Sequence, residues 1–201
     1  MIRTLLSATA VTLAIGGAAS AATIFSDNFD ADALGTPQST LAKWDVTGGS
    51  VDVIGTGSFD FYPGNGNYLD MNGSSLAEGT IQTKGVLGLV SGKTYKLSFS
   101  YGTNNNPGPF PVKLTFGLGS LLTTLQILAQ PSVLQTVTYD IVYDGSGDFI
   151  SFADTSGTPR DQGGPVLDNV ALSAVPLPAA GLMLLAGLAG LAGLRRRKAL
   201  V

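Results

Sequence analysis

The sequence contains no cysteine and no histidine, and it has a single tryptophan, Trp44. Without cysteine the chain can form no disulfide. Without either residue it cannot build a Ser-His-Asp or Cys-His catalytic centre, a histidine general base or a histidine-ligated zinc site. Oxygen donors are what remains, and these suit hard cations such as calcium.

Positive charge is scarce between residues 22 and 174. This region holds all 14 acidic residues of the chain against six basic ones, which gives it a net charge of −8. Six basic residues are too few to neutralise a phosphate backbone. We therefore exclude nucleic acid as a partner. Only one acidic residue, Glu78, is a glutamate, and no dedicated carboxylate pair stands out in the sequence. We therefore predict that the protein is not an enzyme.

The first 21 residues are typical of a secretory signal peptide. Arg3 supplies a positive start, and Leu5–Ala19 is a short apolar run of mostly small residues. Ala19-Ser20-Ala21 fits the small-x-small rule for signal-peptide cleavage. We therefore predict export and a mature chain that begins at Ala22.

The last 27 residues, 175–201, form a second processing segment. The apolar run Leu177–Leu194 carries no charge, and as a helix it would span roughly 27 Å, about the thickness of a bilayer's hydrocarbon core. Arg195–Lys198 follow, and basic flanks stay in the cytoplasm, so residues before Val175 should lie outside. Prolines before the run keep the backbone extended and open to a protease. A permanent membrane anchor is the alternative.

The tail resembles the VPLPA variant of the PEP-CTERM sorting signal. The resemblance is carried by the motif Val175, Pro176, Leu177, Pro178 and Ala179, by the apolar run, and by the terminal cluster Arg195, Arg196 and Arg197. It implies an exosortase-type membrane enzyme as a partner, which cleaves near the prolines. It also implies an inner-membrane form with a periplasmic domain before processing, and a cell-surface or extracellular form afterwards.

Short β-patterned runs separated by turns rich in glycine and asparagine fill the region between these segments. Tyr95, Leu97 and Phe99 share one face of a predicted strand, and Val137 and Tyr139 repeat the alternation. The predicted strands are Thr23–Phe29, Leu41–Val46, Ser50–Ile54, Asn67–Met71, Gly79–Thr83, Thr94–Tyr101, Val112–Leu118, Leu121–Leu128, Val133–Tyr143, Asp148–Ala153 and Val166–Ser173. This pattern predicts one all-β domain, residues 22–174, folded as an antiparallel sandwich.

The two ends of this domain are similar to the opening and closing strands of carbohydrate-binding-module and galactose-binding-like jelly rolls. The resemblance rests on Phe25–Asp30 and on Gly164–Leu172, with Trp44–Ile54 and Gly64–Met71 between them. It implies a jelly-roll β-sandwich in which the first and last strands lie side by side. It also implies a structural calcium ion near them, with Asp30 and Asp168 as ligands and Asp27 as a weaker candidate. Alternatively, Asp168 caps a turn or meets a lysine.

Sugar binding in such folds needs exposed aromatic rings that stack on the apolar face of a sugar. Trp44 alternates with Val46 and is predicted to be core. The candidates are Tyr62, in a glycine-rich segment, and Phe110 with Asn104 and Asn105 in the loop Gly102–Pro111. An ordinary polar turn is the alternative for this loop.

Together these features predict an exported, non-catalytic surface or extracellular-matrix protein that associates with exopolysaccharide through a jelly-roll module. A purely structural envelope protein with no specific ligand is the first alternative. A carbohydrate-active enzyme is the less favoured one.

Overall fold

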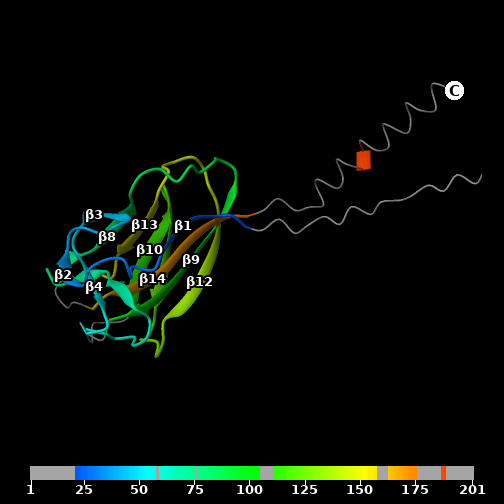
Figure 1. Ribbon diagram of the computed structural model, residues 1–201. Helices are drawn as coiled ribbons and strands as arrows, with labels where there is room; N and C mark the ends of the chain where they lie inside the picture. The colour runs from blue at the N-terminus through cyan, green and yellow to red at the C-terminus, as the bar shows by residue number, and fades with distance from the viewer. Residues whose placement is uncertain are drawn as a thin grey trace, which may run out of the picture. The chain divides into compact units, whose positions relative to one another are not determined.

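The computed structural model describes residues 21–57, 59–75, 77–104, 111–157, 163–175 and 187–188. The chain divides into two compact units, Ala21–Val175 and a unit made of its two ends, Met1–Ser20 and Pro176–Val201. The first unit is an all-β domain, and its described residues contain no helix (Figure 1). The predicted membrane span lies outside the described residues except for residues 187 and 188. In the part of the chain that the structure describes, no helix has the length and hydropathy to cross a bilayer.

Fourteen strands are found in the described residues. They are β1 (Thr23–Asp27), β2 (Gly35–Gln38), β3 (Trp44–Gly48), β4 (Val51–Gly55), β5 (Asn67–Asp70), β6 (Asn72–Gly73), β7 (Ala77–Glu78), β8 (Thr80–Thr83), β9 (Thr94–Thr103), β10 (Val112–Leu118), β11 (Leu121–Ile127), β12 (Gln135–Val142), β13 (Ile150–Asp154) and β14 (Pro165–Ala174). Each of the eleven predicted strands overlaps one of these. The three that were missed are β2, which contains a proline, and the two-residue strands β6 and β7, which are too short for a periodic pattern.

Twelve of these strands form two large antiparallel sheets, and β6 and β7 form a separate two-stranded one. One large sheet has the order β12-β9-β14-β5-β4-β2, with β1 also paired to β14, and the other has the order β11-β10-β13-β8-β3. The first and last strands are therefore neighbours, with Asp27 opposite Val170. This confirms the antiparallel β-sandwich and the predicted pairing of the chain's first and last strands.

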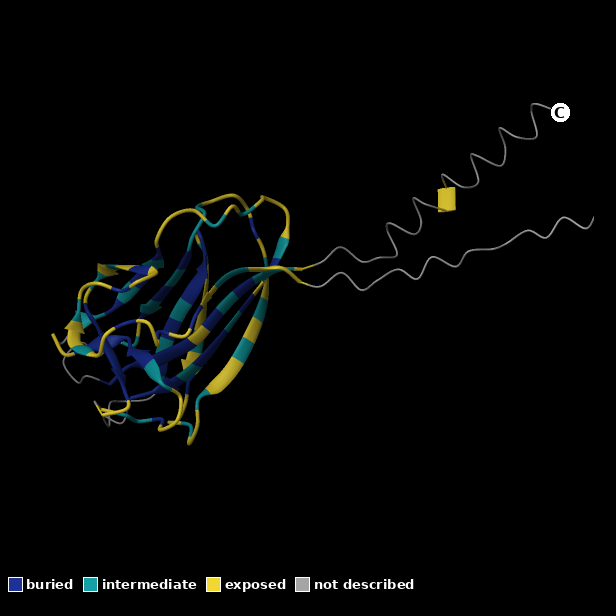
Figure 2. Ribbon diagram, in the orientation of Figure 1, coloured by how far each residue is buried: buried dark blue, intermediate teal, exposed yellow. Residues whose placement is uncertain are grey.

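The main core lies between the two sheets and is rich in aromatic rings. Phe99 of β9 packs edge-on against Phe116 of β10 and Phe152 of β13, with ring centroids 4.8 Å and 5.1 Å apart. Trp44 is fully buried in the same core, as predicted. Because alternate residues of a strand point to opposite faces, the outward residues of β12 remain exposed (Figure 2).

A smaller apolar cluster lies on the opposite, outer face of the larger sheet. Ile54, Tyr68 and Val166 follow or precede residues of the main core directly along their strands, so they point away from it. Tyr62 joins them from the connection between β4 and β5. This connection therefore covers part of the outer face.

Candidate site beside the first and last strands

The first and last strands each carry an unusual backbone conformation beside their pairing region. Asn169 has φ 48°, and the pairing of β14 with β9 shifts register between Asp168 and Ala171. Asparagine is among the residues that tolerate this left-handed conformation. Phe29, just after β1, has φ 56°, which is uncommon for a bulky residue. Its ring is fully buried beside Trp44, with the centroids 6.1 Å apart.

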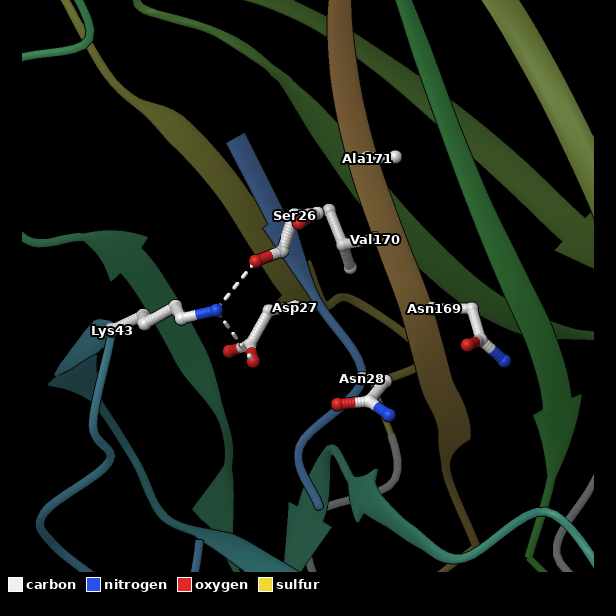
Figure 3. Close-up of a pocket in the computed structure, with 7 residues that line it drawn as sticks. All are labelled: Ser26, Asp27, Asn28, Lys43, Asn169, Val170 and Ala171. Carbon is white, nitrogen blue, oxygen red and sulfur yellow. Dashed lines mark hydrogen bonds and ion pairs between the residues drawn. The ribbon is translucent and has the colours of Figure 1, made fainter. Parts of the chain in front are cut away.

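A shallow cavity of about 250 Å³ lies where β1 meets β14 (Figure 3). It is lined by Ser26, Asp27, Asn28, Lys43, Asn169, Val170 and Ala171. The Lys43 ammonium donates a hydrogen bond to the Ser26 carbonyl at 2.6 Å and lies 3.5 Å from Asp27 Oδ1. The other carboxylate oxygen of Asp27 accepts the indole N–H of Trp44 at 2.8 Å. Asp27 is therefore already neutralised by a cation of the chain itself.

The other two candidate calcium ligands have hydrogen-bond partners from the backbone. Asp168 is fully buried, and its Oδ1 accepts the backbone N–H of Asn169 at 2.6 Å. Asp30 is exposed, and its Oδ1 accepts the backbone N–H of Asn67 at 2.8 Å. Burial raises the pKa of Asp168 to about 7, and repulsion from Asp30 and Asp27 acts in the same direction. The three predicted carboxylates therefore lie close enough in the structure for the charges of Asp30 and Asp27 to act on Asp168.

The chemistry of this neighbourhood suits a hard cation only in part. Among the described residues, no group of three or more acidic side chains is arranged to hold a metal ion. With Asp27 paired to Lys43, the carboxylates left for a cation are those of Asp30 and Asp168. Two carboxylates need backbone carbonyls and water to complete the six to eight oxygens that calcium prefers.

The predicted sugar-contacting residues do not form an exposed site in the described structure. Tyr62 is buried, and its hydroxyl accepts the backbone N–H of Thr103 at 2.9 Å and donates to the Thr103 carbonyl at 2.8 Å. Asn104 is also buried, and its side-chain amide donates to Asp70 at 2.8 Å. Tyr62 therefore has no free face on which a sugar could stack, because its ring is buried in the small outer cluster with Ile54, Tyr68 and Val166. Asn105 and Phe110 lie outside the described residues.

A second group of buried carboxylates was not singled out from the sequence. Asp52 on β4 and Asp70 on β5 lie directly opposite each other, and Asp154 enters from β13 of the other sheet. All three are more than nine-tenths buried. Burial raises the pKa of Asp70 to about 7 and that of Asp154 to about 6, with further repulsion at Asp70 from Asp52 and Asp154. The only sign of this group in the sequence was that Asp52 and Asp70 each stand between apolar residues on two consecutive predicted strands.

One described aromatic ring is substantially exposed to solvent. Phe59, in the β4–β5 connection, is 68% exposed and has φ 50°, a left-handed conformation that is rare for a bulky residue. Phe61 of the same connection packs on the small outer cluster together with Leu134, which directly precedes β12. The connection therefore borders the outer face of β9 and β12.

The outer face of β9 and β12 carries a ladder of hydroxyl and charged side chains. Ser100 and Thr136 lie opposite each other, and their hydroxyl oxygens are 3.1 Å apart. Thr138 donates to Ser98 at 3.3 Å, and Lys96 pairs with Asp140 at 2.7 Å. This face is polar, and Phe61 and Leu134 pack on the apolar cluster next to the start of β12.

No protein-family model matches the sequence, and no curated protein matches it. The chain is similar in structure to an arabinose-bound α-L-arabinofuranosidase, MgGH51, with 18% identity and a TM-score of 0.50 over 71% of this chain and 25% of that one. The CBM22-1 and GH10 modules of Clostridium thermocellum xylanase 10B, complexed with xylohexaose, match at 13% identity and a TM-score of 0.47 over 78% of this chain and 29% of theirs. The CBM22-1 xylan-binding domain of Paenibacillus barcinonensis Xyn10C matches at 13% and 0.43, over 81% of this chain and 100% of its own. At such identities, a likeness shows the fold alone.

Proposed function

We propose that this chain is an exported, non-catalytic module of the cell surface or extracellular matrix that associates with polysaccharide. The observations that carry the proposal are the exposed ring of Phe59 in the β4–β5 connection and the hydroxyl ladder on the outer face of β9 and β12. An aromatic ring offers a sugar its apolar stacking partner, and serine and threonine hydroxyls offer hydrogen bonds. The net charge of −8 in residues 22–174 favours a neutral polysaccharide over an acidic one.

A catalytic role has less support. Asp52, Asp70 and Asp154 include two carboxyls with strongly raised pKa, as a general acid requires, but the three side chains are enclosed. A glycosidase needs its two carboxyl groups on either side of a cleft that holds the sugar. A structural envelope protein with no specific ligand is the second candidate, and it is favoured by the small number of exposed aromatic rings among the described residues.

The test is retention of the purified protein in native gels that contain neutral or acidic polysaccharides. Retardation by a neutral polysaccharide is expected, and Phe59→Ala should reduce it several-fold because the stacking surface is lost. Val86→Ala is the matched control, since Val86 is a large apolar residue that is 83% exposed in a different loop. Equal retardation of Phe59→Ala and the unaltered protein would refute this site. No retardation by any polysaccharide would favour the structural role.

The sorting tail belongs to the same proposal. Val175 is the one motif residue that the structure describes, and its N–H donates to the Thr94 carbonyl at 3.1 Å. The other motif residues, Pro176–Ala179 and Arg195–Arg197, lie outside the described residues. Intact-mass measurement of the exported protein is expected to show loss of about residues 1–21 and of the segment beyond Val175–Ala179. A mature protein that still contains Leu182–Leu194 would indicate a permanent anchor and contradict exosortase-type processing.

A structural calcium ion at Asp168 and Asp30 is the remaining element of the proposal. When bound, such an ion would offset the negative charge of these two carboxylates. At a hundred times its Kd, calcium would add about 2.7 kcal/mol to the free energy of unfolding. A chelator should then lower the melting temperature, and Asp168→Asn should abolish that sensitivity, whereas Asp140→Asn on exposed β12 should retain it. Identical melting curves with and without chelator would remove calcium and leave Asp168 a purely hydrogen-bonding role.

A further inference from the structure

The edge strands of the two large sheets differ in how well they are protected against pairing with a strand of another chain. The terminal strands are β12 and β2 in one sheet and β11 and β3 in the other. An edge strand presents unpaired backbone N–H and C=O groups, and proteins protect such edges with proline, charge, bulges or short length. β2 has four residues, contains Pro37 and pairs irregularly, and β3 has a register shift between Val46 and Gly48. β12 carries the charge of Asp140.

β11 has none of these protections. Its seven residues, Leu121–Ile127, pair with β10 in an unbroken register and include no charge, no proline and no glycine. Leu122 is 58% exposed, and Leu128 just beyond the strand is exposed as well. Leucine, threonine and isoleucine form such a strand readily, and an uncharged regular edge is a template for strand addition. No described strand covers this edge.

We propose that β11 pairs antiparallel with β11 of a second copy of this chain, which joins the two five-stranded sheets into one continuous sheet. The two-fold axis passes beside Thr124, so that Thr124 faces its own copy and Leu122 faces Gln126. β11 carries no charge, so this register places no like charges opposite each other. It stands independently of the polysaccharide proposal.

The two faces of the strand restrict which registers are possible. Leu121 and Ile127 lie opposite Leu118 and Val112 of β10, whose side chains point into the core. With Thr124 opposite its own copy, Leu121 of one copy meets Ile127 of the other, and both stay on the core side of the extended sheet. A slip by one residue would place core-side residues opposite outward ones, so registers that differ by one residue are excluded.

Cysteine cross-linking of the full chain in membranes of the producing cell tests this inference directly, because the native sequence has no cysteine. Thr124→Cys is expected to give a disulfide-linked or bis-maleimide-linked dimer in high yield. Gln126→Cys alone should give several-fold less, because each copy of residue 126 faces Leu122. A mixture of Leu122→Cys and Gln126→Cys chains should restore the dimer.

Two controls distinguish specific pairing from random collision. Thr138→Cys, on the exposed face of β12, should cross-link no more than background. Adding Thr124→Lys to the Leu122→Cys and Gln126→Cys chains should abolish their cross-link, because two lysines would then lie opposite each other. Thermal unfolding of each variant confirms that it folds. Thr124→Cys cross-linking no better than Thr138→Cys would overturn the proposal, as would insensitivity to Thr124→Lys.

Discussion

Lowering the pH from about 8 to about 5 is expected to stabilise this protein against unfolding, and Asp70→Asn is expected to remove a large part of that effect. Asp70 is buried, and burial raises its pKa to about 7. Asp52 lies directly opposite it on β4, and Asp154 of the other sheet adds further repulsion. Its hydrogen bonds from the Asn72 backbone and the Asn104 amide favour the charged form, but they do not outweigh burial.

The direction of this pH dependence follows from the number of protons bound by the folded protein and by the unfolded chain. In the unfolded chain an aspartate has its ordinary pKa of 3.8, so between 3.8 and about 7 the folded protein binds more protons at Asp70 than the unfolded chain does. The stability that protonation gives is fully present below 3.8 and is lost as the pH rises through about 7. One such group changes the unfolding free energy by on the order of 3–4 kcal/mol across this window.

The measurement is urea unfolding at several pH values. In Asp70→Asn, the slope of unfolding free energy against pH should fall by up to about 1.4 kcal/mol per unit, with the other aspartates whose pKa is raised supplying the remaining slope. Asp144→Asn is the control, because Asp144 is fully exposed and hydrogen bonds from Ser146 lower its pKa. It should leave the slope between about pH 5 and 8 unchanged. If Asp70→Asn and the unaltered protein have the same slope, Asp70 is not the group responsible for the pH dependence.

Trp44→Ala is expected to cost roughly 3–5 kcal/mol of unfolding free energy, the range for removal of a large buried aromatic side chain. The indole ring is fully buried and contacts Phe25 and Phe152, with centroids 5.1 Å and 5.9 Å away. Its N–H is also the 2.8 Å donor to Asp27 Oδ2. Both packing and a hydrogen bond to a buried carboxylate are therefore lost.

Trp44→Phe separates these two contributions. Phenylalanine keeps most of the apolar volume but leaves Asp27 without the indole donor, for which we expect a cost of about 1–3 kcal/mol. Phe59→Ala is the matched control and should change stability by less than about 0.5 kcal/mol, because that ring is exposed. Urea unfolding followed by circular dichroism measures all three. A cost of Trp44→Ala no larger than that of the control would contradict the central position of this ring.

Alternation of apolar and polar residues was sufficient to predict eleven of the fourteen strands found in the described residues. In β9, Tyr95, Leu97 and Phe99 were assigned to one face, and all three are buried in the core. The period of a strand is set by backbone geometry, so the pattern can be read before the fold is known. Pairing of the first and last strands was implied by the resemblance to jelly rolls, and the register of β1 with β14 confirms it.

Only the tertiary structure shows which faces of the sheets are covered by other parts of the chain. Alternation places Asp70 and Tyr68 on the face opposite the main core, but it cannot show that the β4–β5 connection folds over that face. Tyr62 therefore became a buried structural residue instead of an exposed ligand contact. The pairing of Lys43 with Asp27, 16 residues apart in sequence, likewise depends on the start of β3, in the other large sheet, packing against β1. Burial and charge pairing depend on chain segments distant in sequence, so local patterns predict the strands but not the environment of their polar side chains.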